Sequence, residues 1–157
     1  MTDTAIIGIG NLYRSDDAAG WAVIDSLDGR APQGIALYKL HPDIGQMLGL
    51  FTEHSTLFLI DAWKGPKKGP AFVRFDPMKD GKLLRTSCTS THGISVKSCI
   101  DLAEALSMLP KKIIIYAIRV ENTTLSTSMT TEIQKTIEKV ASTILEEPEV
   151  YQCMKKV

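Results

Sequence analysis

Three short, nearly continuous apolar runs constrain the fold of this chain more than any other feature. They cover residues 4–9, 57–60 and 113–118. Strands that are covered by other elements on both faces have this composition, whereas strands with one face in water alternate between apolar and polar residues. Each run is strand-sized and falls far short of the ~20 residues that span a bilayer. The runs therefore predict central strands of a parallel sheet and no transmembrane segment.

Segments with helical spacing separate these runs. After Ser15, the residues Ala19, Val23 and Leu27 recur at helical intervals until Asp28-Gly29 ends the segment. The other predicted elements are a strand over 34–40, a turn over 41–43, a short helix over 44–50, a strand over 71–75, a helix from 96 to 109 stopped by Pro110, and a last helix from 129 to 145 that ends before Pro148.

This alternation of strands and helices predicts a three-layer α/β/α sandwich of the phosphorylase/hydrolase-like kind. Its sheet is expected to be twisted and mostly parallel, with ligands at the carboxyl ends of the strands. We expect a single domain over residues 1–147 and a loose C-terminal tail over 148–157. At 157 residues, a domain buries roughly 70% of the surface that its unfolded chain exposes, so the core needs no structural metal or disulfide.

Charge and cysteine content narrow the possible partners and location. The 18 Lys and Arg residues balance the 18 Asp and Glu residues, which gives no overall attraction to nucleic acid or to an anionic membrane. The apolar run near the N-terminus lacks the basic segment and the cleavage site of a secretory signal. The three cysteines have no C-x-x-C spacing. We expect a cytoplasmic monomer with reduced thiols and with neither a nucleic-acid nor a membrane partner.

Polar residues occur at three positions where this fold usually presents ligand-binding side chains. Asp16 and Asp17 follow the first strand, Asp61 ends the third strand, and His92 precedes the helix that starts near residue 96. Two carboxylates and one imidazole suit Zn²⁺ or Ni²⁺ and leave positions open for water or substrate. Each position also has an ordinary explanation. Ser15 with the two acids can be a helix N-cap with first-turn charges, Asp61 can cap a turn, and His92 can be structural.

Other chemistries fit the sequence less well. Gly8-Ile9-Gly10 resembles a phosphate cradle, but Tyr13 stands where the dinucleotide fingerprint needs a third glycine. No G-x-S-x-G elbow is present, which disfavours a serine hydrolase. Cys88, four residues before His92, has no sequence-local base to activate it. Lys64, Lys67 and Lys68 form a basic loop after Asp61, which is more typical of a solvated turn than of a substrate clamp.

The motifs together resemble those of the hydrogenase maturation endopeptidases, which trim the C-terminal extension of the large subunit of nickel-iron hydrogenases. The first motif is Gly8-Ile9-Gly10-Asn11 with Arg14-Ser15-Asp16-Asp17 and Gly20, the second is Ile60-Asp61-Ala62 with Gly65 and Gly69-Pro70, and the third is Ser90-Thr91-His92. The turn His41-Pro42-Asp43 is similar to that of one branch of the family. The resemblance spans residues 4 to 145.

The resemblance implies an unusual metal chemistry. The family's metal ligands fall on Asp17, Asp61 and His92, and the nickel they recognise is carried by the hydrogenase large-subunit precursor. Other divalent ions such as Zn²⁺ or Cd²⁺ can occupy such a site. The metal can polarise a peptide carbonyl or activate a bound water, with Asp16 or Asp43 as a candidate general base.

The sequence is compatible with three functions. The first is a nickel-dependent endopeptidase that acts on the precursor. The second is a non-cleaving chaperone or binding module that docks the same precursor through the same three residues. The third is a small-molecule hydrolase or phosphorylase on a related α/β fold.

Overall fold

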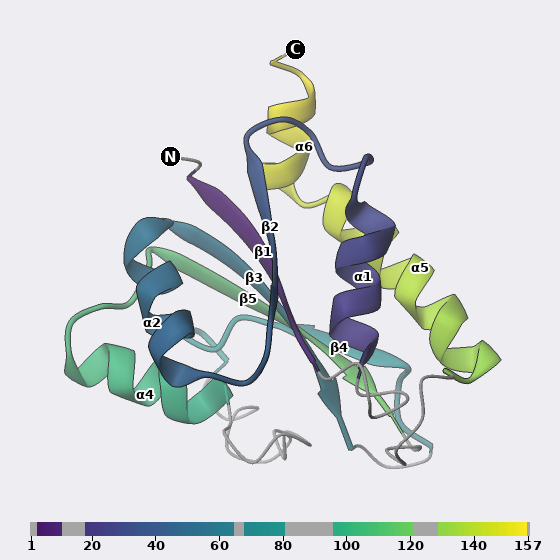
Figure 1. The fold of residues 1–157 in the computed structure, drawn as a ribbon, viewed down its shortest axis with the longest axis horizontal. Helices are drawn as coiled ribbons and strands as arrows, with labels where there is room; N and C mark the ends of the chain where they lie inside the picture. Colours follow the sequence, from purple (N-terminus) through teal and green to yellow (C-terminus); the bar gives the residue numbers. More distant parts are fainter. Residues whose placement is uncertain (1–2, 11–17, 65–67, 81–95, 121–128, 157) are drawn as a thin grey trace.

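The protein is built around one five-stranded sheet. The computed structural model describes residues 3–10, 18–64, 68–80, 96–120 and 129–156. The strand order is β2-β1-β3-β5-β4 (Figure 1). The neighbours β2–β1, β1–β3 and β3–β5 are parallel, and β4 alone runs antiparallel at one edge. The strands are β1 (Thr4–Ile9), β2 (Ile35–Leu40), β3 (Thr56–Trp63), β4 (Phe72–Phe75) and β5 (Lys112–Arg119).

The three central strands owe their position to the apolar runs. Strand β1 is buried along its whole length, β3 is buried at all but its last residue, and β5 is buried at all but its two end residues. Successive side chains point to opposite faces, so each strand supplies both layers of the core. On one face lie Ile6, Phe58, Ile60 and Tyr116, and on the other lie Ile7, Leu59 and Ile115. Both faces must therefore be covered by helices.

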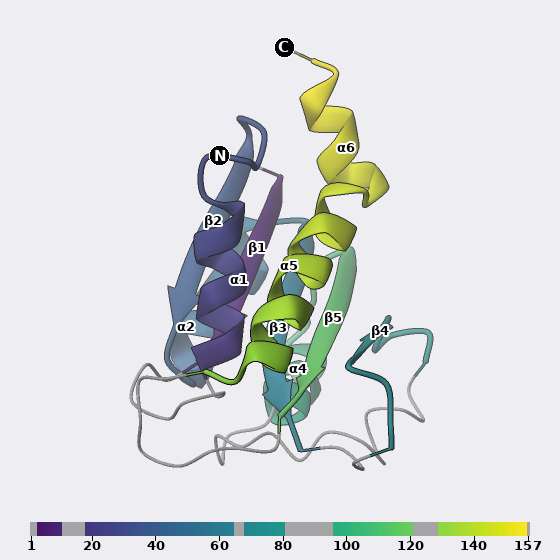
Figure 2. The ribbon, with the colours of Figure 1, turned by 90° about the vertical axis from the view of Figure 1, so that its right-hand side faces the viewer.

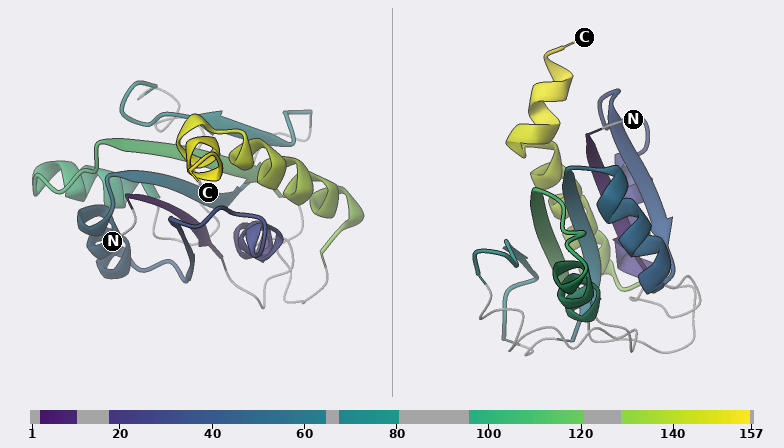
Figure 3. Two further views of the ribbon diagram at one scale, coloured as in Figure 1. Left: turned by 90° about the horizontal axis from the view of Figure 1, so that it is seen from above. Right: turned by 90° about the vertical axis from the view of Figure 1, so that its left-hand side faces the viewer.

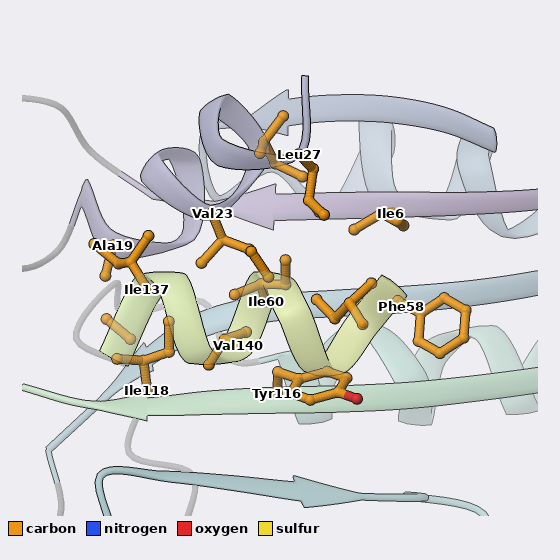
Figure 4. Packing of buried hydrophobic residues seen from close by; sticks show 14 of the residues in the cluster. Ile6, Ala19, Val23, Leu27, Phe58, Ile60, Tyr116, Ile118, Ile137 and Val140 are labelled. Carbon is orange, nitrogen blue, oxygen red and sulfur yellow. The ribbon is translucent and has the colours of Figure 1, made fainter. Parts of the chain in front are cut away.

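Two pairs of helices cover the two faces. Helices α1 (Ala19–Leu27) and α5 (Thr131–Leu145) pack on the first face, where Val23, Leu27, Ile137 and Val140 meet the strands (Figures 2 and 4). Helices α2 (Ile44–Glu53) and α4 (Val96–Ala105) cover the second face (Figure 3). The expected α/β/α sandwich with a mostly parallel sheet is confirmed. None of the helices in the described ranges is long and apolar enough to cross a membrane.

Helix α4 is shorter than the sequence pattern predicts. It ends at Ala105, although apolar residues continue at helical spacing to residue 109. The chain leaves the helix through Ser107, whose φ is 55°, and the N–H of Met108 closes back on the carbonyl of Ala103 at 2.7 Å. The turn therefore precedes Pro110, the residue expected to end the helix.

The C-terminal segment is the clearest correction to the expected fold. The sequence reading predicts a loose tail from residue 148, but Pro148–Met154 forms helix α6, which extends from the end of the molecule where the strands begin (Figure 2). Proline pre-sets the backbone for the first position of a helix, so Pro148 starts this helix as well as ending α5. Val150 is completely buried. The segment is thus a folded helix that Val150 anchors to the core, while most of its other residues are exposed.

A buried carboxylate ties this segment to the sheet. Glu147 is 5% exposed and accepts hydrogen bonds from Arg74 of β4, with Nη2 to Oε2 at 3.0 Å, and from the hydroxyl of Tyr116 of β5. Lys112 and Glu149 form a second ion pair beside it. Burial raises the pKa of Glu147, but the hydrogen bonds from Arg74 and Tyr116 outweigh it and hold the pKa below its ordinary value.

Candidate active site

Asp61 lies near the carboxyl end of β3, two residues before its last residue, Trp63, where a doubly covered parallel sheet places its ligands. Its residue is 6% exposed, and its side chain points to the same face as Leu59, towards the layer of α2 and α4. Its Oδ1 accepts the N–H of Ala62 at 2.8 Å. An ionisable side chain that is this deeply buried is uncommon, so Asp61 is a strong candidate for function.

The register of the sheet brings the end of β2 to the same edge. Gly8 pairs with Lys39 on one side and with Ile60 on the other, so the residues that follow, Leu40 and Asp61, flank Ile9 at the end of β1. Two strand spacings of about 4.8 Å separate their backbones by about 10 Å. The turn after β2 and the end of β3 therefore border one edge.

Helix α1 begins directly over the ends of β1 and β3. A Cβ atom on Gly20 would stand 2.5 Å from the carbonyl oxygen of Ile9 and 2.8 Å from that of Ile60. Only glycine permits such a close approach, and this explains the need for Gly20. The N-terminus of α1 is fixed by this contact at the carboxyl edge, next to the residue that precedes Asp61.

The expected helix cap at Ser15 is wrong. Helix α1 starts at Ala19 with Ala18 at the N-cap position, none of the described side chains caps it, and its first turn contains no acid. Asp16 and Asp17 precede this helix in the chain and lie outside the described residues. The composition of Ser15-Asp16-Asp17, which is typical of a helix cap, predicts an earlier start than the one observed at Ala19.

Asp43 has a structural partner at this edge. It is the N-cap residue of α2, and its Oδ1 accepts the N–H of Gln46 at 3.0 Å. The side chain is exposed. Its candidacy as a general base stays a prediction, and the role that the structure assigns to it is the cap.

Of the three predicted metal ligands, Asp61 is the one that lies among the described residues. Asp17 and His92 lie outside the described residues, as does the candidate base Asp16, so the convergence of Asp17 and His92 with Asp61 stays a prediction. Among the residues that are described, no group of three or more His, Cys, Asp or Glu side chains could hold a metal ion.

The structure describes some of the lysines and cysteines that the sequence analysis considered. Lys64 and Lys68 are exposed, as expected of a solvated loop, while Lys67 and Cys88 lie outside the described ranges. Cys99 and Cys153 are free thiols. Burial raises the pKa of Cys99 to about 11, which keeps it protonated and unreactive at neutral pH.

One contact at the carboxyl edge of the sheet, between Trp21 and His41, was not predicted from the sequence. The rings of Trp21 in α1 and His41 after β2 meet edge-on, with centroids 4.8 Å apart and planes at 69°. The indole Nε1–H of Trp21 also donates to the carbonyl of Leu40 at 2.9 Å. The residues are twenty positions apart in the sequence, so no local pattern predicts the contact.

Comparison with known protein families identifies the family of this chain. The family model described as hydrogenase maturation protease matches residues 43–147. The chain belongs to this family. The resemblance noted from the motifs is thereby confirmed, and the protein is a hydrolase of the peptidase class. The matched stretch contains Asp43, Asp61 and His92, but it begins after Asp16 and Asp17.

Solved structures agree with this protease in fold. The hydrogenase maturating endopeptidase HybD from E. coli superposes with a TM-score of 0.76 at 19% identity, covering 90% of this chain and 89% of that one. The [NiFe] hydrogenase maturation protease HybD from Thermococcus kodakarensis gives 0.75 at 21% identity, covering 90% and 95%. HycI from Thermococcus kodakarensis gives 0.69 at 22% identity, covering 92% and 91%. No curated protein matches the chain in sequence.

Proposed function

We propose that this protease is an endopeptidase that removes the C-terminal extension of a hydrogenase large-subunit precursor that already carries nickel. Family membership supports the peptidase activity. The buried carboxylate of Asp61 at the carboxyl edge of the sheet is the observation that carries the rest of the proposal. A carboxylate held in this way is suited to meet a cation that the substrate brings.

Asp17, Asp61 and His92 recognise the nickel in this proposal. Two contacts of their chain neighbours support it. Gly20, three residues after Asp17, packs against Ile60, the residue before Asp61. Val96, four residues after His92, is buried in the layer that covers the face of the sheet to which Asp61 points. The nickel is part of the substrate, so the isolated protease is expected to hold it weakly, and Zn²⁺ or Cd²⁺ can take its place.

The reaction is the hydrolysis of one peptide bond. Water adds to the carbonyl carbon, the C–N bond breaks, and the new amine takes a proton. A divalent ion beside the bond can polarise the carbonyl or lower the pKa of a bound water to about 7. Asp16 and Asp43 remain the candidate bases, and because Oδ1 of Asp43 is engaged by Gln46, only its second oxygen would be available for that role.

The proposal is tested by processing of nickel-loaded precursor with two matched variants. Asp17→Asn keeps the size of the side chain but removes its charge, so it should abolish cleavage at a near-normal melting temperature. Lys67→Ala changes the basic loop and should cleave like the wild type, with a stability change within about 0.5 kcal/mol. Wild-type rates for Asp17→Asn would overturn the nickel-recognition mechanism. Binding of the precursor without any cleavage by the wild type would favour the non-cleaving chaperone.

A further inference from the structure

His41 is an exposed imidazole at the carboxyl edge of the sheet. It follows Leu40, the last residue of β2, and its ring lies edge-on against Trp21 with 4.8 Å between the centroids. Aromatic rings prefer such edge-to-face arrangements, which limits the rotation of the imidazole. The ring is therefore oriented although its residue is exposed to solvent.

The indole that holds His41 is itself fixed to the ends of two strands. The carbonyl oxygen of Leu40 accepts the indole N–H of Trp21 at 2.9 Å and the backbone N–H of Gly10 at 3.0 Å. Trp21 follows Gly20, which packs closely on the ends of β1 and β3. Contacts with the backbone of β1, β2 and β3 thus fix α1, and with it the position of Trp21 beside His41.

The imidazole nitrogens have no hydrogen-bond partner within the described part of the chain. A neutral imidazole carries one N–H donor and one nitrogen acceptor. A ring that is oriented by its neighbours, yet leaves both of these groups to the solvent, can offer them to a polar ligand without paying for ordering the side chain.

The spacing from Asp61 indicates what that ligand is. Leu40 and Asp61 flank Ile9, with about 10 Å between their backbones, the length of about three residues of extended peptide at 3.3 Å each. The ring of His41 lies against Trp21 of α1, the helix on the first face of the sheet, whereas Asp61 points to the face that α2 and α4 cover. Side chains that point to opposite faces suit a peptide that runs along the edge better than a shared metal ion.

We propose that His41 is a substrate-contacting residue of this protease, whose imidazole hydrogen-bonds the main chain of the precursor a few residues from the cleaved bond, with Trp21 as its positioning residue. This inference rests on the proposed function, because the peptide it requires is the precursor. No covalent step is assigned to His41, and the contact acts on binding alone.

The test compares four variants of the full chain with nickel-loaded precursor. His41→Ala removes the contact, His41→Gln keeps a donor and an acceptor, and Trp21→Phe keeps a ring but loses the hydrogen bond to Leu40. Gln33→Ala is the matched control, since Gln33 is exposed just before the opposite end of β2. The measurements are Kd for the precursor by calorimetry, KM and kcat of processing, and binding of Ni²⁺ alone.

We expect His41→Ala to raise Kd and KM about three- to tenfold with kcat retained, as the loss of one hydrogen bond predicts. His41→Gln should restore most of the affinity, Trp21→Phe should fall between the two, and Gln33→Ala should match the wild type. Binding of Ni²⁺ alone should be the same in all variants.

Two results would overturn the inference. The first is an unchanged Kd and KM in His41→Ala. The second is loss of Ni²⁺ binding in both His41→Ala and His41→Gln, which would make His41 a metal ligand, since an amide replaces an imidazole poorly in that role. A wild type that binds the precursor but leaves it uncut would contradict the proposed function instead, while its Kd, compared with that of His41→Ala, would still decide the role of His41.

Discussion

Asp61 already has one partner within the fold, and this limits which substitutions can report on its chemistry. Its Oδ1 accepts the N–H of Ala62, and both residues are buried, where a lost hydrogen bond costs stability. A change that removes both charge and oxygen therefore mixes loss of function with loss of stability. A change that keeps the oxygen separates the two.

Asp61→Asn is predicted to lose binding of Ni²⁺ and processing of precursor while the protein stays folded. The amide oxygen can still accept the N–H of Ala62, but the charge that attracts a divalent ion is gone. Calorimetric titration with Ni²⁺ and a thermal melt measure the two effects. Asp61→Ala is the comparison, and it should lower the free energy of unfolding by a further ~1–3 kcal/mol. If Asp61→Asn bound Ni²⁺ as the wild type does, Asp61 would not be a ligand.

At the scale of elements, the close packing of α1 on the sheet holds the start of this helix beside β3. The contact depends on the absence of a side chain at Gly8 and Gly20, since a Cβ on either would collide with backbone atoms or a neighbouring side chain. Backbone atoms of a buried strand cannot move aside cheaply, so a methyl group there must push the helix away.

Gly20→Ala is predicted to destabilise the protein by about 1–3 kcal/mol and to lower processing as well, because the start of α1 would shift away from the ends of β1 and β3. Gly49→Ala in α2 is the matched control. No atom lies within 4 Å of its would-be Cβ, so alanine should stabilise the helix by about 0.5–1 kcal/mol. Denaturant melts of both variants check the sign. Equal stability of Gly20→Ala and the wild type would refute this account of how α1 is positioned.

The elements themselves were largely predictable, and the exceptions have physical causes. The apolar runs located β1, β3 and β5, because burial on both faces leaves an unmistakable composition. The start of α1 was misplaced because capping residues favour, but do not dictate, a helix start, and the fit of Gly20 against the sheet overrides them. Helix α6 was missed because its position depends on distant residues: Val150 is buried in the hydrophobic cluster on the first face, and Glu147 accepts hydrogen bonds from β4 and β5.

At the scale of the whole molecule, the cluster of Glu147, Arg74 and Tyr116 joins the C-terminal segment to the far edge of the sheet. The hydrogen bonds from Arg74 and Tyr116 hold the pKa of Glu147 below its ordinary value near 4.5, against the opposite effect of burial. A carboxyl that is more acidic in the folded protein stabilises it at pH values above the unfolded pKa. That contribution is lost as the pH falls through the folded pKa.

Glu147→Gln is therefore predicted to be less stable than the wild type at pH 7, by about 1–3 kcal/mol. The difference should begin to shrink as the pH falls below about 4.5, the ordinary pKa of a glutamate, and should vanish once the pH is below the lower pKa of the folded wild type. Urea unfolding at a series of pH values measures it. Glu146→Gln, at the exposed neighbouring position, should follow the wild type throughout. A difference between Glu147→Gln and the wild type that did not depend on pH would contradict the ionic account of the cluster.

The position of the site was predictable from the fold class, but its full set of residues was not. A parallel sheet puts ligands at its carboxyl edge, and this located Asp61 from the sequence. The contact of Trp21 with His41 depends on how α1 sits against the end of β2, which no local spacing encodes. Convergence of Asp17 and His92 with Asp61 follows from the resemblance and stays a prediction.

The intact mass of nickel-loaded hydrogenase large-subunit precursor, before and after incubation with the purified protease, tests the central claim most directly. We predict a single loss of mass equal to a C-terminal fragment, with the N-terminus of the precursor unchanged, and no such loss with Asp61→Asn. A precursor that keeps its full mass in the presence of the folded wild-type protease would contradict the account.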